Sequence, residues 1–103
     1  MAPSQNAIGL IETRGIVALM AGIEAMMKTA DVQTVSIERI GSGYFSAAVK
    51  GGIAAVRQAL DSGAAAVRQY GELRSAQLYP RPDEVSAALL DNGTREVLSG
   101  GAS

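Results

Sequence analysis

Apolar residues follow two different spacings along this chain. In some short segments they are nearly continuous or occupy every second position, as in strands, and in longer segments they recur every three or four positions, as in amphipathic helices. Strands are therefore predicted over 7–12, 32–40, 44–50 and 73–79. Helices are predicted between them, over 14–29 and 53–70.

Each helix is expected to bury one stripe of apolar side chains. In the first helix the stripe consists of Ile16, Leu19, Met20, Ile23 and Met27. Thr13 stands where a side-chain N-cap belongs, and Lys28 lies in the last turn, where a cation interacts favourably with the helix dipole. In the second helix the stripe consists of Ile53, Val56, Leu60 and Val67. Gly63 should weaken that helix by about 1 kcal/mol relative to alanine, and Gly71 is well placed to end it.

Two of the predicted strands are joined by Gly41-Ser42-Gly43, which indicates a β-hairpin. In the strand before this link, Val35 and Ile37 alternate with polar residues, a pattern typical of a half-buried strand. A phosphate-binding loop would need the longer G-x-x-x-x-G-K-[ST] pattern, or G-x-G-x-x-G opening a helix, whereas here the glycines precede a strand. A plain turn accounts for the glycines, but it leaves open why one hydroxyl stands between two residues without side chains.

The fourth strand is followed by Pro80-Arg81-Pro82, in which two prolines restrict the backbone on either side of one guanidinium. Arg81 is then either an exposed residue at a strand exit or an interface arginine docked to carbonyls or a carboxylate of a neighbour. A short helix over 84–90, which Asp83 is placed to cap, comes next. The residues 91–103 are predicted to be a loose tail.

The predicted elements follow the order strand, helix, strand, strand, helix, strand, which is the ferredoxin-like pattern. It implies an α+β fold with a four-stranded antiparallel sheet, both helices on one face, and the short C-terminal helix and tail in addition. A chain of 103 residues is expected to form one domain, here assigned to 6–90 and followed by the tail over 91–103. This fold hosts many unrelated functions, so the pattern alone assigns none.

The composition indicates that part of the surface is covered in an assembly. Apolar residues make up 48% of the chain and charged residues only 18%, below the roughly 25% of an average soluble domain. Nine basic and ten acidic residues leave no basic excess for nucleic-acid phosphates. No segment approaches the roughly 18 consecutive apolar residues of a membrane span, and residues 1–6 do not resemble a secretory signal. We therefore expect an intracellular protein that contacts other subunits and neither nucleic acid nor membrane.

The chain contains neither histidine nor cysteine, which excludes several kinds of site. Imidazole bases, thiolate nucleophiles, disulfides and the usual zinc ligands are all absent. Glu12 and Glu24 have no evident partner carboxylate, and Lys28 or Lys50 would act as a base only with a strongly lowered pKa. The sequence therefore predicts no catalytic residues, no metal site, no cofactor and no enzymatic activity.

Six short motifs occur in order along the chain. They are AIGLIETRG (7–15), AMMKTA (25–30), IGSG (40–43), GAAA (63–66), GE (71–72) and PRP (80–82). In this combination and spacing, the chain from about 6 to 90 resembles the single-domain shell proteins of bacterial microcompartments, the kind that forms hexamers. The resemblance implies a flat six-fold tile. Many such tiles form the wall of a protein-bounded organelle in the cytoplasm, which encloses metabolic enzymes.

The resemblance also implies a role for the glycine-rich hairpin. In this family the loop lines a pore on the six-fold axis, and the corresponding residues here are Arg39, Ile40, Gly41, Ser42 and Gly43. Copies of one loop that converge on an axis leave room only for small side chains, and glycine permits a close approach of backbones. The hydroxyl of Ser42, nearby backbone N–H groups and the charge of Arg39 would favour the passage of small polar or anionic metabolites.

Contacts between hexamers are expected at Lys28, Asp31 and Arg81. The resemblance places Lys28 against its own copy along the tile edge, Asp31 beside that edge, and Arg81 in a pocket of the adjacent tile. Tyr44 and Phe45 depart from the family pattern, which has smaller aliphatic residues after the pore loop.

The partners implied are the other chains of a homohexamer, neighbouring hexamers, other shell proteins and the enclosed enzymes. One alternative remains, an oligomeric ferredoxin-like sensor that binds a metabolite at a subunit interface. The two hypotheses differ at Lys28 and Arg81, because a sensor needs no lateral edge and forms no extended sheets.

Overall fold

The computed structural model describes residues 7–80, which form four strands and two helices. Their bounds are β1 Ala7–Arg14, α1 Ile16–Thr29, β2 Val32–Gly41, β3 Tyr44–Gly51, α2 Ile53–Tyr70 and β4 Glu72–Tyr79. The type of each of these elements is confirmed, with ends within two residues of the predicted ones. Arg81, the helix over 84–90, the tail over 91–103 and the domain limit at 90 lie outside the described residues.

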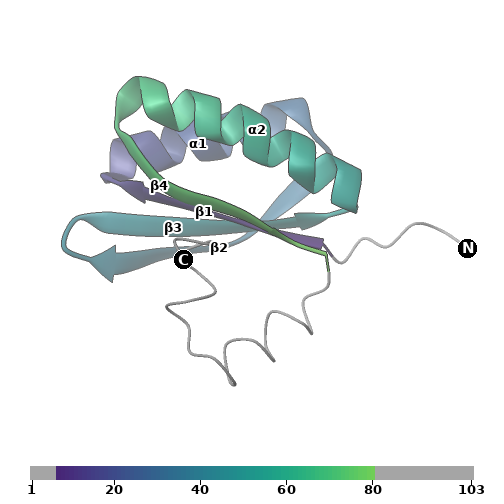
Figure 1. Cartoon of the computed structure of the whole chain (residues 1–103), viewed down its shortest axis with the longest axis horizontal. Helices are drawn as coiled ribbons and strands as arrows, with labels where there is room; N and C mark the ends of the chain where they lie inside the picture. Colours follow the sequence, from purple (N-terminus) through teal and green to yellow (C-terminus); the bar gives the residue numbers. More distant parts are fainter. Residues whose placement is uncertain (1–6, 81–103) are drawn as a thin grey trace, which may run out of the picture.

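The strands form one antiparallel sheet with the order β2-β3-β1-β4. Figure 1 shows α1 and α2 side by side on one face of this sheet. The arrangement confirms the ferredoxin-like prediction. It also makes β2 and β4 the two edge strands of the sheet that residues 7–80 form.

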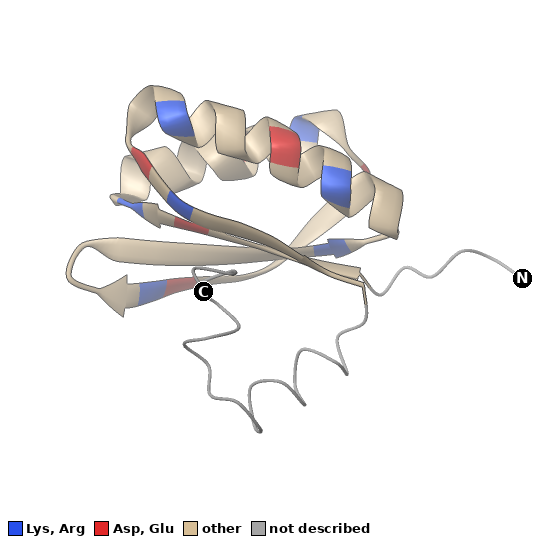
Figure 2. Ribbon diagram, in the orientation of Figure 1, with Lys and Arg blue, Asp and Glu red and all other residues tan. Residues whose placement is uncertain are grey.

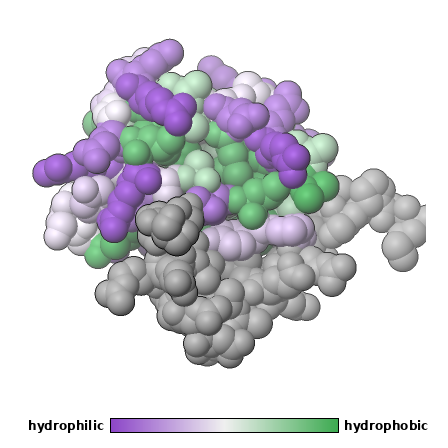
Figure 3. All heavy atoms as spheres, in the orientation of Figure 1, coloured by the Kyte–Doolittle hydropathy of each residue, from purple (hydrophilic) through white to green (hydrophobic). Residues whose placement is uncertain are grey.

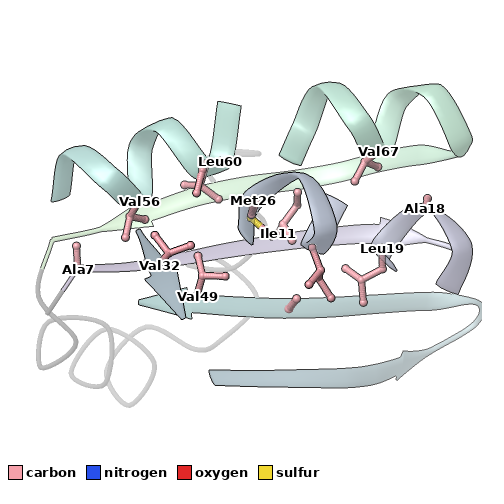
Figure 4. Packing of buried hydrophobic residues seen from close by; sticks show 13 residues of the cluster. Ala7, Ile11, Ala18, Leu19, Met26, Val32, Val49, Val56, Leu60 and Val67 are labelled. Carbon is pink, nitrogen blue, oxygen red and sulfur yellow. The ribbon is translucent and has the colours of Figure 1, made fainter. Parts of the chain in front are cut away.

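The core lies between the helices and the sheet. Its largest fully buried apolar side chains are Ile11, Leu19, Met26, Val49, Val56 and Val67. In α2, the buried residues Val56, Leu60 and Val67 point toward the sheet, as the stripe predicted (Figure 4). Ile53, in the first turn of α2, is 44% exposed and does not belong to the core.

The inward face of α1 differs from the predicted stripe. Leu19 and Ile23 are buried as predicted, but Met26 is fully buried where the stripe predicted Met27. The remaining members of the stripe are exposed, namely Ile16, Met20 and Met27. The reason is that α1 packs against α2 as well as against the sheet, and the small residues Ala18 and Gly22 turn inward to allow this contact.

Thr13 does not cap α1. Strand β1 continues to Arg14, so the helix begins two residues later than predicted and its N-cap is Gly15, with a φ of 90° and no side-chain capping bond. Thr13 is instead fully buried in β1, and its Oγ1 donates a hydrogen bond of 3.0 Å to the carbonyl oxygen of Gly15.

The two helices touch at a pair of glycines. A Cβ built on Gly63 would lie 2.7 Å from Cγ of Met26, and one built on Gly22 would lie 2.7 Å from Cγ2 of Val67. Either side chain would force the helices apart, because real Cβ atoms do not approach so closely. Gly63, which the sequence marked only as a weak point of α2, is therefore required by the packing of α1 against α2.

We predict that Gly63→Val lowers the free energy of unfolding by about 2 kcal/mol, because the added methyl groups overpack the helix contact. Ala65→Val is the matched control, since it introduces the same side chain on the exposed side of the same helix, where it costs only helix propensity. Urea unfolding at a fixed protein concentration compares the two variants. Equal midpoints would contradict the role given to Gly63.

Candidate functional site

The hairpin between β2 and β3 closes with a two-residue loop. Gly41 and Tyr44 are paired across the ladder, which leaves Ser42 and Gly43 as the loop. Their φ angles are 56° and 84°, and positive φ at both positions is the requirement of a type I′ turn. Gly41 also has a positive φ, 114°. The loop therefore needs its glycines for backbone reasons, and Ser42 adopts a conformation that non-glycine residues disfavour.

Glycine is not needed here to avoid contacts within one chain. Apart from the glycine and its two chain neighbours, no atom among residues 7–80 lies within 4 Å of a Cβ built on Gly41 or on Gly43. Ser42 and Gly43 are exposed, and Ile40 beside them is 50% exposed. The predicted pore residues thus form an uncovered surface, together with Arg39, whose position at the end of β2 is also exposed.

The loop is tied to the start of α1. The backbone N–H of Gly15 donates a hydrogen bond of 2.7 Å to the carbonyl oxygen of Gly43. The carbonyl oxygen of Gly15 in turn accepts a hydrogen bond from the hydroxyl of Thr13. The loop therefore has a fixed connection to the rigid part of the domain on one side.

A cluster of charged and aromatic side chains lies at the same end of the sheet, and sequence reasoning did not find it. Two arginine side chains approach the Tyr44 ring, with guanidinium carbons 4.6 Å (Arg74) and 5.9 Å (Arg14) from its centroid. Arg74 Nη1 also lies 2.9 Å from Oε2 of Glu12. These residues come from three strands, so no local sequence motif contains them. In the sequence, only the departure of Tyr44 from the family pattern pointed to this cluster.

The residues expected at the tile edge lie at the other end of the domain. Lys28 is in the last turn of α1, with its Nζ 3.5 Å from Oε2 of Glu24, and Asp31 follows in the connection to β2. Strand β4 also ends there, at Tyr79, just before the predicted edge residue Arg81, which lies outside the described residues. Helix α1 has 14 residues and therefore spans about 20 Å, which is the approximate distance between the hairpin end and the Lys28 end of the domain. Figure 1 shows the hairpin loop at the opposite end from the end of β4.

Two apolar surfaces remain uncovered at the two edges of the sheet. On β2, Val35, Ile37 and Ile40 are 47%, 49% and 50% exposed. The alternation of Val35 and Ile37 predicted a half-buried strand, but the other elements of residues 7–80 leave about half of each side chain exposed. On the other edge an open groove runs between α2 and β4, where Figure 3 shows hydrophobic residues gathered. Its lining residues are Arg57, Leu60, Asp61, Ala64, Arg68, Leu73, Ala76 and Leu78.

The described residues offer little for catalysis. Over 7–80, no group of three or more acidic side chains is placed to hold a metal ion. Figure 2 shows acidic and basic residues interspersed along α2 and the strands. Partial burial raises the pKa of Tyr79 further above neutral pH, so its phenol is no candidate for a base. Neither α1 nor α2 is long and apolar enough to cross a membrane.

Three comparisons place the chain among known proteins. The family model of the BMC domain matches residues 7–82. The bacterial microcompartment shell protein PduA of Citrobacter freundii is 40% identical over 89 residues, which cover 86% of this chain and 96% of PduA. The shell protein EutM of Salmonella typhimurium is 49% identical over 77 residues, which cover 75% of this chain and 80% of EutM.

The fold has a solved relative as well. The crystal structure of a microcompartment protein from Desulfitobacterium hafniense DCB superposes with a TM-score of 0.70 and 27% sequence identity. The match covers 84% of this chain and 50% of that one, so the present chain spans half the length of the solved protein. The chain belongs to the BMC domain family, which confirms the resemblance of its motifs to single-domain shell proteins of bacterial microcompartments.

Proposed function

We propose that this chain is a structural protein of a bacterial microcompartment shell, where it forms closed hexamers that tile the wall and surround a central pore. The similarity to PduA and EutM supports this function, because both are named shell proteins and this chain spans most of each. The other shell proteins and the enclosed enzymes are then its partners. The shell, an assembly in the cytoplasm, is its location.

The observation that carries the proposal is the presence of two different uncovered apolar surfaces on opposite edges of one sheet. A contact between unlike surfaces repeats from copy to copy and forms a ring when the rotation closes. In this ring, the exposed Val35, Ile37 and Ile40 of one chain occupy the groove between α2 and β4 of the next. The contact also covers β2, whose exposed edge would otherwise invite aggregation.

Ring closure along these edges gives the two ends of the domain different surroundings. Strands β2 and β4 both run between the hairpin end and the Lys28 end, so one end faces the axis and the other faces outward. The hairpin end, with its small exposed loop, is the end that suits an axis. Six copies of Ser42 and of the neighbouring backbone groups then line the pore. Arg39 adds positive charge, which favours small polar or anionic solutes.

The outward end supplies the contact between hexamers. A two-fold axis brings the same surface of two copies together, so Lys28 meets its own copy and Asp31 lies beside it. Arg81 enters a pocket of the neighbouring hexamer. A metabolite sensor of the same fold would need none of these outward contacts, and the named relatives favour the shell protein over the sensor.

We expect the purified protein to have the mass of six chains in native conditions and to form sheets or tubes in negative-stain electron microscopy. Both results follow if each chain has two complementary edges and one self-complementary outer end. A monomer or dimer that never tiles, at any salt or protein concentration, would refute the proposal.

We predict that Ile37→Glu breaks the hexamer into smaller species, because a charged carboxylate must be desolvated in every ring contact where an apolar side chain was buried before. Ser36→Glu is the matched control. It places the same charge one residue earlier on β2, on the opposite face of the strand. Native mass spectrometry of both variants gives the oligomer distribution. Six-chain assemblies of undiminished abundance in Ile37→Glu would contradict the assignment of this edge.

We predict that Arg81→Ala leaves the hexamer intact and reduces the extent of sheets and closed shells, because the contact between hexamers loses a guanidinium held by two prolines. Lys28→Ala should act in the same direction, since it removes the other cation of the edge. Native mass verifies the ring, and electron microscopy measures sheet area. Assembly equal to that of the unaltered protein would refute the role of Arg81.

A further inference from the structure

The Tyr44 cluster lies on the face of the sheet away from the helices, at the base of the hairpin loop. Side chains alternate along β1, and Ile11 and Thr13 point into the core, so Glu12 and Arg14 lie on the other face. Tyr44 is paired with Arg14 in the ladder and is also the residue that follows Gly43. The cluster therefore adjoins the loop through the chain itself.

Arg74 reaches the Tyr44 ring because of an irregularity in β4. Along β1, Glu12 pairs with Ser75 and Thr13 with Leu73, which leaves Arg74 as an extra residue opposite no partner. A bulge of this kind redirects the side chain of the extra residue. Here it sends the guanidinium across β1 to a ring on β3, two strands away.

Both groups in the contact are held in place. The guanidinium carbon of Arg74 lies 4.6 Å from the ring centroid, within the range of a cation–π interaction. Glu12, whose side chain is only 13% exposed, accepts from Arg74 Nη1 at 2.9 Å and orients it. The guanidinium carbon of Arg14 lies 5.9 Å from the centroid of the same ring, and Arg14 Nη1 lies 4.0 Å from Oε1 of Glu72. Both distances are longer than the corresponding ones of Arg74, and the Arg14 and Glu72 side chains are more exposed.

We propose that Tyr44 and Arg74 are positioning residues for the pore loop, which they hold in addition to the Gly15 hydrogen bond. This inference rests on the proposed function, which makes Ser42 and Gly43 pore residues. The loop has one anchor at the Gly15 N–H and a second at Tyr44, which is joined to Gly43 by a peptide bond and to Gly41 by the ladder. With both anchors in place, Ser42 stays in its disfavoured conformation and the opening of the pore keeps one width.

The first test is amide hydrogen exchange on the assembled full-length protein, measured by mass spectrometry. We expect Tyr44→Leu to speed the exchange of the loop amides roughly tenfold relative to the other strands, because the cation–π contact is lost. Tyr44→Phe keeps the ring and should exchange within about twofold of the unaltered protein. Tyr70→Leu is a control, since Tyr70 is an exposed tyrosine at the end of α2.

A double-mutant cycle separates a direct contact from general destabilisation. If Tyr44 and Arg74 act through each other, Tyr44→Leu with Arg74→Gln changes loop exchange no more than either substitution alone. Additive effects would overturn the proposal. So would loop exchange that is unchanged in Tyr44→Leu, or exchange that rises by the same factor throughout the core.

The second test is ion conductance through hexamers in a planar bilayer. We expect the Tyr44→Leu pore to give a broader distribution of conductance levels than the unaltered pore, and Tyr44→Phe to restore the narrow one. Identical distributions would overturn the positioning role. If the unaltered protein forms no ring, the proposed function fails, whereas the exchange data still decide whether Tyr44 and Arg74 hold the loop.

Discussion

The pairing of β1 with β3 on one side and β4 on the other is the interaction on which the rest of the structure depends. Because side chains alternate along a strand, this central strand sends Ile11 and Thr13 under the helices and Glu12 and Arg14 to the opposite face. Its register brings Gly15 beside the hairpin loop and Arg14 beside Tyr44. The core, the loop anchor and the charged cluster therefore all follow from one strand.

The same pairing leaves β2 and β4 as the edge strands of the sheet, and the proposed assembly uses both of them. A small domain with few charges has apolar surface that it cannot cover itself. Part of that surface lies on the β2 edge and in the α2–β4 groove, and part lies on α1 at Ile16, Met20 and Met27. The membership in the BMC domain family is consistent with such a shape. In the proposed tile, the lateral edges would make the ring, and the two remaining ends would serve the pore and the contact between tiles.

Much of the fold could be predicted from local patterns. Apolar spacing located the four strands and two helices of residues 7–80, and Gly41-Ser42-Gly43 identified the hairpin, because a tight turn imposes positive φ on particular residues. The motifs around the loop also indicated the family. The rotation of α1 was predicted incorrectly, since Met26 and not Met27 is buried. That choice depends on the neighbouring helix, which the spacing within α1 does not describe.

The sequence by itself determined the element order, the hairpin, the absence of histidine and cysteine chemistry and the likeness to shell proteins. These features depend on residue type and on spacing within short segments. The tertiary structure alone decided that Gly63 serves a helix contact and that Arg74 meets Tyr44 across β1. Such contacts join residues distant in the chain, and they exist only when strand pairing and helix packing have brought those residues together.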